Sequence, residues 1–135
     1  MEPALKQAVL LLGIAALPAA ATLVFTLKWE PPAEFREAKA AEVRAHLDNF
    51  VWVDVRDEER YEKAHIPGAL SVKDTEHSQG IDRVRAVWIP GKKIVVYGEG
   101  IGSDRALRVA RLIKKELQTK DVLLLEGGWA AWPRN

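Results

Sequence analysis

The chain has 135 residues, of which 48% are hydrophobic and 29% charged, and its formal net charge is +1. These values suit one small globular domain with an appendage, and because basic and acidic residues are interleaved they predict no nucleic-acid partner. The sequence contains no cysteine and only three dispersed histidines, which excludes disulfides and thiol catalysis and predicts neither a metal site nor another cofactor.

The N-terminal region has the composition of a membrane span. Residues 8–27 carry no charge and are bracketed by Lys6 and Lys28, and a run of this length crosses a hydrocarbon core of about 30 Å. We therefore predict that residues 1–28 form a single-pass anchor in the cell membrane. The alternative is a cleaved signal peptide, because residues 19–21 are all alanine, but the apolar run continues beyond this point.

Residues 29–34 contain a tryptophan and two prolines, which is typical of an interfacial anchor followed by a stiff spacer. We interpret them as a linker to a domain that spans residues 35–135. The lysines and arginines that follow the span favour a cytoplasmic domain, whereas the very short flank before it is typical of anchors that export their C-terminal domain. Of the two orientations we favour export, which places the domain on the extracytoplasmic (periplasmic) side.

The domain begins with alternating helix and strand patterns. Apolar residues at helical spacing predict a helix over residues 40–47, and the β-branched run at residues 51–55 is typical of a strand buried in a parallel sheet. Asp57 is placed to cap a short helix. A Pro-Gly turn then leads to a short strand at residues 69–72.

The second half repeats this alternation. Residues 81–88 predict a helix whose apolar face includes Val87, and residues 93–97 are again a buried-strand pattern. A long amphipathic helix opens at Ser103, and residues 122–125 are the last predicted strand. Repeated strand–helix units predict an α/β domain with helices on both faces of a mostly parallel sheet.

The turn after the strand at residues 93–97 is the main candidate site, because α/β sheets bind ligands at the carboxyl ends of their strands. Three glycines within residues 98–102 allow the backbone N–H groups to turn inward beside a helix N-terminus, which favours an anion. Ser103 and Arg105 are the candidate anion-binding residues. Glu99 places a negative charge beside them and opposes an anion.

Several separate motifs resemble those of the rhodanese family. They are VWVDVRDEERYEKAHIPGAL at residues 51–70, KIVVYGEG at 93–100, SDRALRVARL at 103–112 and LLLEGGWAAW at 123–132. The resemblance implies a three-layer α/β/α fold with a five-stranded parallel sheet. It also implies transfer of sulfane sulfur, in active members, through a cysteine persulfide directly after the strand that ends at residue 97.

This sequence departs from the family at that cysteine, because Gly98 occupies its position. A glycine cannot carry a persulfide, and the Ser103 hydroxyl has too high a pKa to replace a thiolate without an adjacent base. We therefore predict no catalytic residue. The loop is interpreted as a relic that comprises Gly98, Glu99, Gly100, Ile101, Gly102 and Ser103.

The remaining signature residues are predicted to be structural. They are Asp54, Arg56, His65, Pro67, Gly68, Gly127, Gly128 and Trp129. For Asp54 and Arg56 the family resemblance implies hydrogen bonds that order the site, but we favour an ion pair that supports the fold.

The favoured function is a membrane-anchored, catalytically inactive binding or regulatory module that recognises a protein partner or a small anion. One alternative is a sulfurtransferase that works by a non-standard route. Another is a nucleotide-binding domain, because Gly98-x-Gly100 before a helix and Glu126 after the next strand mimic a dinucleotide fingerprint. Ser103 stands where that fingerprint has its third glycine.

Overall fold

A computed structural model describes residues 33–134 of the chain. The domain belongs to one compact unit that begins at Glu34. The membrane span predicted for residues 8–27 lies outside the described residues. Among the residues that are described, no helix is both long and apolar enough to cross a bilayer.

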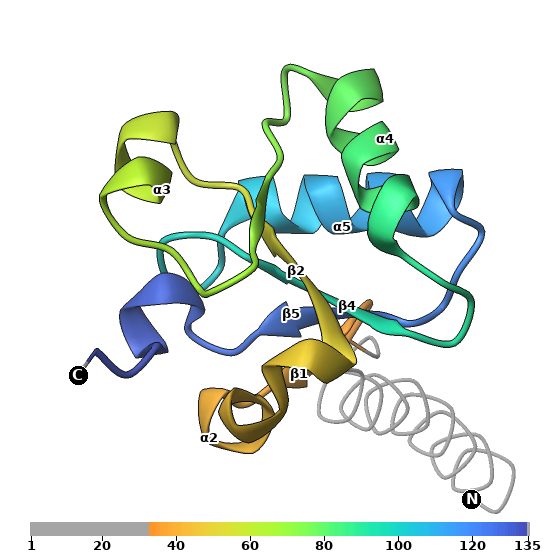
Figure 1. The fold of residues 1–135 in the computed structure, drawn as a ribbon. Coiled ribbons are helices and arrows are strands. Elements are labelled where there is room, and N and C mark those ends of the chain that lie inside the picture. The colour runs from red at the N-terminus through yellow and green to blue at the C-terminus, as the bar shows by residue number, and fades with distance from the viewer. Residues whose placement is uncertain (1–32, 135) are drawn as a thin grey trace, which may run out of the picture. The chain divides into compact units, whose positions relative to one another are not determined.

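The domain is built on a five-stranded sheet in which all pairs are parallel (Figure 1). In sheet order the strands are β1 (Arg36–Ala38), β5 (Val122–Leu125), β4 (Lys93–Tyr97), β2 (Phe50–Asp54) and β3 (Leu70–Ser71). The central strands are covered on both faces, which explains their continuous runs of β-branched residues. The predicted α/β class and parallel sheet are confirmed.

Helices cover both faces of the sheet. One face packs against α4 (His77–Val87) and α5 (Asp104–Glu116), whose buried residues share a core with Val53, Val96 and Ile94. The other face packs against α2 (Ala40–Val43), with the short 3-10 helices η1 (Arg44–Asn49) and η2 (Gly128–Ala131). A further helix, α3 (Glu58–Lys63), follows β2. Tyr61 of this helix packs against the second core.

Three local predictions are confirmed only in part. The helix predicted over residues 40–47 is interrupted, because His46 has non-helical φ/ψ angles of −135° and 51°. Val87 does not join the core and is 50% exposed, because α4 ends there and its buried stripe runs through Ile81 and Val84. Asp57 occupies the N-cap position of α3 as predicted, but its side chain makes no capping bond, since its carboxylate is bound by Arg105 instead.

The first strand, β1, carries no recognisable sequence pattern. It has only three residues, and only Ala38 is buried. Its conformation depends on backbone pairing with β5, where Glu37 is in register with Leu124. This pairing is a tertiary contact between segments far apart in the chain, and a local periodicity cannot reveal it.

Candidate functional site

The candidate site lies at the carboxyl edge of the sheet, where the loop of residues 98–103 connects β4 to α5. Ser103 is the N-cap of α5, and its Oγ accepts a hydrogen bond from the Ala106 N–H at 3.3 Å. The helix thus begins where the sequence predicts it. Asp104 in its first turn is favourably placed beside the positive end of the helix dipole.

The side chain of Ser103 occupies the space next to Gly98. A Cβ atom added at Gly98 would overlap the Ser103 hydroxyl and lie 2.6 Å from the Ser103 Cβ, with the Val55 Cγ2 at 3.7 Å. Cβ atoms in proteins do not approach other non-bonded heavy atoms closer than about 3 Å, so any side chain at position 98 requires Ser103 to move. The loop is therefore packed around a glycine, and the sequence contained no signal of this contact.

The Gly127-Gly128-Trp129 motif holds the loop through backbone hydrogen bonds. The N–H of Trp129 donates to the Gly98 carbonyl at 2.8 Å, and the N–H of Ala130 donates to the Glu99 carbonyl at 2.9 Å. Gly128 has a φ of +60°, and a Cβ there would lie 2.7 Å from the Gly98 carbonyl oxygen. Only glycine combines this backbone conformation with so close an approach.

Arg56 connects the end of β2 to the loop. Its guanidinium binds the fully buried Asp54, with Nη2 2.8 Å from Oδ2, and also donates to the Ala64 carbonyl at 2.6 Å. The same group lies 4.3 Å from the centre of the Trp129 ring. Burial opposes the charge of Arg56, but hydrogen bonding and attraction to Asp54 together raise its pKa above the ordinary value.

The His65 segment has polar contacts within the fold. The His65 ring stacks on Tyr61 with centroids 4.0 Å apart, and its Nδ1 lies 2.8 Å from the Tyr61 carbonyl oxygen. The N–H of Ile66 donates to the Tyr97 hydroxyl at 3.1 Å. Pro67 follows, and Gly68 has a φ of +81° that suits a turn. Burial and the nearby Asp54 raise the pKa of Tyr97, so the hydroxyl stays protonated.

On one side of the loop lies a recess of about 390 Å³, which we call the arginine recess. Its lining includes Arg56, Arg60, Arg105 and Arg108 together with Asp57, Glu99 and Asp104. The predicted anion-binding candidate Arg105 does lie here, but its Nη1 binds Asp57 at 2.6 Å. That hydrogen bond lowers the pKa of the Asp57 carboxyl.

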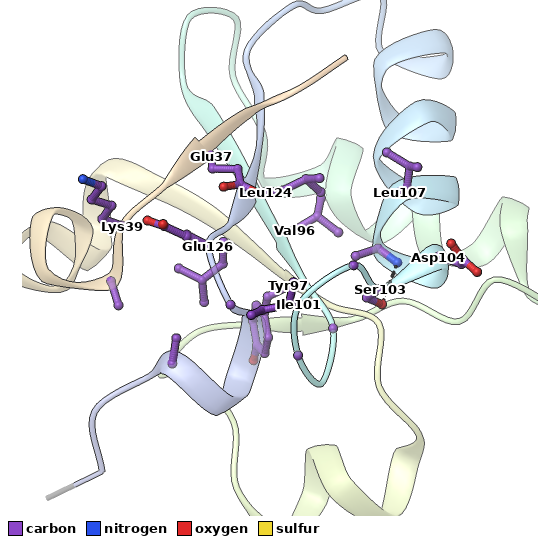
Figure 2. Close-up of a pocket in the computed structure, with 18 residues that line it drawn as sticks. Glu37, Lys39, Val96, Tyr97, Ile101, Ser103, Asp104, Leu107, Leu124 and Glu126 are labelled. Atoms are coloured by element: carbon purple, nitrogen blue, oxygen red, sulfur yellow. Dashed lines mark hydrogen bonds between the residues drawn. The ribbon is translucent and has the colours of Figure 1, made fainter. Parts of the chain in front are cut away.

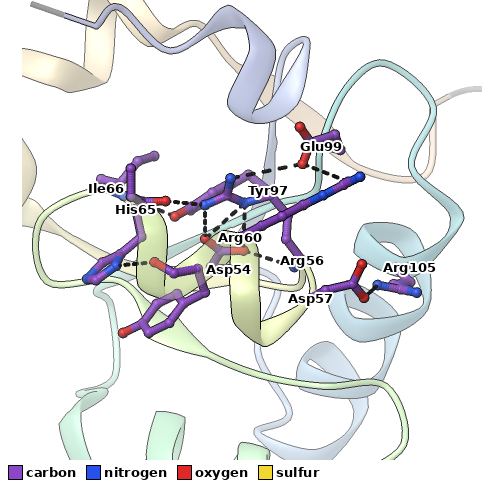
Figure 3. Close-up of polar contacts among 11 residues, drawn as sticks. Asp54, Arg56, Asp57, Arg60, His65, Ile66, Tyr97, Glu99 and Arg105 are labelled. Atoms are coloured by element: carbon purple, nitrogen blue, oxygen red, sulfur yellow. Dashed lines mark hydrogen bonds and ion pairs between the residues drawn. The ribbon is translucent and has the colours of Figure 1, made fainter.

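Glu99 is one of the acidic residues that line the arginine recess, and its carboxylate faces Arg56 and Arg60 (Figure 3). Its Oε2 lies 3.2 Å from the Arg60 Nη1 and 4.0 Å from the Arg56 Nη1. Arg60 and Arg108 were not predicted as site residues. Arg60 lies far from the loop in sequence, and only the fold brings α3 beside it. Arg108 lies in the second turn of α5, and it lines the recess because of the helix face on which it lies.

On the other side of the loop lies a larger cavity of about 700 Å³, which we call the acidic groove (Figure 2). Its apolar lining comes from β4, β5 and the first turns of α5, and includes Val96, Leu107 and Leu124. Glu37, Asp104 and Glu126 also line it. No group of three or more potential metal ligands exists among residues 33–134.

Comparison with known proteins identifies a family. The model of the rhodanese-like domain matches residues 39–135 of the chain. No curated protein matches this chain.

Several solved structures share the fold. The BH2092 protein from Bacillus halodurans has a TM-score of 0.60 and 24% identity, covering 85% of this chain and 80% of that one. An As-Sb reductase from Leishmania major has a TM-score of 0.59 and 19% identity, covering 73% and 77%. A rhodanese-related protein from Thermoplasma volcanium has a TM-score of 0.53 and 17% identity, covering 73% and 96%.

Proposed function

We propose that this chain, which belongs to the rhodanese-like domain family, is a catalytically inactive member that acts as a membrane-tethered binding or regulatory module. One observation carries the proposal. The side chain of Ser103 occupies the space into which a side chain at position 98 would extend. The loop has thus lost the family's nucleophile and has also closed the space that a nucleophile would need.

No other group of the loop supplies the missing chemistry. Sulfur transfer through a persulfide needs a sulfur nucleophile, and the chain contains no cysteine. Ser103 accepts a hydrogen bond from the Ala106 N–H, and among the described residues its hydroxyl has no carboxylate or imidazole partner that would act as a base. Its contacts support a role as helix cap and space-filling group.

The charges of the arginine recess favour a protein partner over a small anion as the ligand of this domain. Arg60, Arg105 and Arg108 each bind a carboxylate of the same domain. Glu99 places its own negative charge where an external anion would approach Arg56. A small anion therefore has to displace Glu99, which favours a protein partner as the ligand of the module.

Thiocyanate formation from thiosulfate and cyanide tests the proposal. The full-length protein in detergent, freed of small thiols, is expected to show no turnover above the buffer blank. A Gly98→Cys/Ser103→Gly variant restores the thiol and vacates the space beside it. Thiocyanate formation by this variant would show that the rest of the pocket is intact. Sustained turnover by the unmodified protein would overturn the proposal.

Membrane tethering is a separate part of the proposal and rests on the uncharged run at residues 8–27. We expect the chain to stay in the membrane fraction after alkaline carbonate washing. With export, protease added to intact spheroplasts removes the domain, whereas a cytoplasmic domain stays protected until the membrane is opened. Release of an N-terminally shortened protein into the soluble fraction would support a cleaved signal peptide instead.

A further inference from the structure

The acidic groove has an open apolar floor. Val96 at its base is fully buried, whereas Leu107 and Leu124 are only partly covered by the domain. The cavity of about 700 Å³ lies within the range of roughly 300–1,000 Å³ that small ligands and side-chain anchors occupy in proteins. The groove therefore has room for aliphatic side chains from another molecule.

The charges around this floor are predominantly negative. Glu37, Asp104 and Glu126 are exposed, and within residues 33–134 no ion pair neutralises any of them. Lys39 is the only basic residue in the lining that the structure describes. This balance differs from the arginine recess, where carboxylates of the domain neutralise the arginines. A rim whose carboxylates outnumber its one lysine attracts cations and repels anions and nucleic acids.

Ile101 adds an apolar contact at the edge of the groove. It lies in the loop of residues 98–103, lines the groove and is 94% exposed. A single exposed aliphatic residue is ordinary by itself. Here it stands beside an open apolar floor and an acidic rim, so a partner that enters the groove covers all three features at once.

We propose that the acidic groove binds a short cationic peptide segment of a partner protein, in which an aliphatic side chain is flanked by lysine or arginine. The aliphatic side chain packs against Leu107, Leu124 and Ile101, and the flanking cations face the carboxylates of the rim. This assignment rests on the proposed role of the domain as a binding module, and it specifies that the partner contributes a cationic, aliphatic segment. The peptide contacts the relic loop from the side opposite the arginine recess.

Fluorescence anisotropy tests the assignment with the full-length protein in nanodiscs of neutral phosphatidylcholine. The probe is a fluorescein-labelled Gly-Lys-Leu-Lys-Leu-Lys-Gly peptide. We expect saturable binding that weakens as salt is raised from about 50 to 500 mM, because ions screen exposed charges. Peptides with glutamate in place of lysine, or serine in place of leucine, are expected to bind at least about tenfold more weakly.

A charge-matched pair of variants locates the binding site. Glu37→Lys/Glu126→Lys is expected to weaken binding by about tenfold, as opposite-charge contacts become repulsive. Glu62→Lys/Glu116→Lys changes the net charge equally at exposed positions outside the groove lining and is expected to bind like the parent protein. Both proteins are checked for unchanged thermal unfolding.

Three results overturn the assignment: no saturable binding, equal binding of the glutamate peptide, or equal losses in the two charge variants. The thiocyanate assay on the same samples separates this failure from failure of the proposed function. Absent turnover with absent peptide binding rejects the groove assignment alone, whereas robust turnover rejects the inactive module on which it rests.

Discussion

Introducing a cysteine at Gly98 is expected to destabilise the domain unless Ser103 is changed with it. The φ of Gly98 is not positive, so the backbone itself accepts an L-residue. The cost comes from overlap, since the new Cβ would lie 2.6 Å from the Ser103 Cβ. If Ser103 rotates away, α5 loses the capping bond from the Ala106 N–H.

The expected cost combines three contributions. Overpacking of a closed site costs about 1–3 kcal/mol, and loss of a helix cap costs about 1 kcal/mol. Restricting the unfolded chain by replacing glycine offsets about 0.4–1 kcal/mol. The free energy of unfolding of Gly98→Cys is therefore expected to be lower than that of the parent protein by about 1–3.6 kcal/mol.

A double-mutant cycle with Ser103→Gly isolates the contact. Ser103→Gly alone is expected to cost only a few tenths of a kcal/mol, because glycine is tolerated at an N-cap. The double variant is expected to be more stable than Gly98→Cys, which gives a coupling energy of at least about 1 kcal/mol. Urea unfolding followed by tryptophan fluorescence measures all four proteins. Additivity within about 0.5 kcal/mol would refute the conclusion that Ser103 fills the space beside Gly98.

Three further changes have expected outcomes. Arg56→Met leaves the buried Asp54 carboxylate unpaired and is expected to lower the free energy of unfolding by about 3–5 kcal/mol in urea titrations, whereas a loss below about 1 kcal/mol would contradict the central role of this ion pair. Gly128→Ala is expected to cost at least about 1–3 kcal/mol because of its φ of +60° and the nearby Gly98 carbonyl, while Gly100→Ala, which has open space around its Cβ, is the near-neutral control. Glu99→Gln removes the carboxylate that faces Arg56 and is expected to strengthen thiosulfate binding several-fold in calorimetry; unchanged or weaker binding would show that Glu99 does not compete with anions.

Several elements of the fold follow from local sequence patterns. The strand predicted over residues 93–97 matches β4, and the strand predicted over residues 122–125 matches β5. The long helix opens after Ser103 as predicted, because its N-cap and apolar stripe are both local signals. The missing cysteine is also a property of the sequence alone. Strand and helix patterns can be read from the sequence because buried residues repeat at the period of the strand or helix.

The arrangement of the site was decided by tertiary structure. Ser103 and Gly98 are both visible in the sequence, but only the path of the loop shows that the side chain of one fills the space beside the other. Arg105 was predicted as an anion ligand, but the fold brings the first turn of α5 near Asp57, the residue before α3, and the two side chains form an ion pair. Ion pairs between distant segments depend on how elements pack, a property that no local periodicity encodes. The sequence alone therefore determined the fold class and the loss of the nucleophile, whereas the folded chain decided what occupies its place.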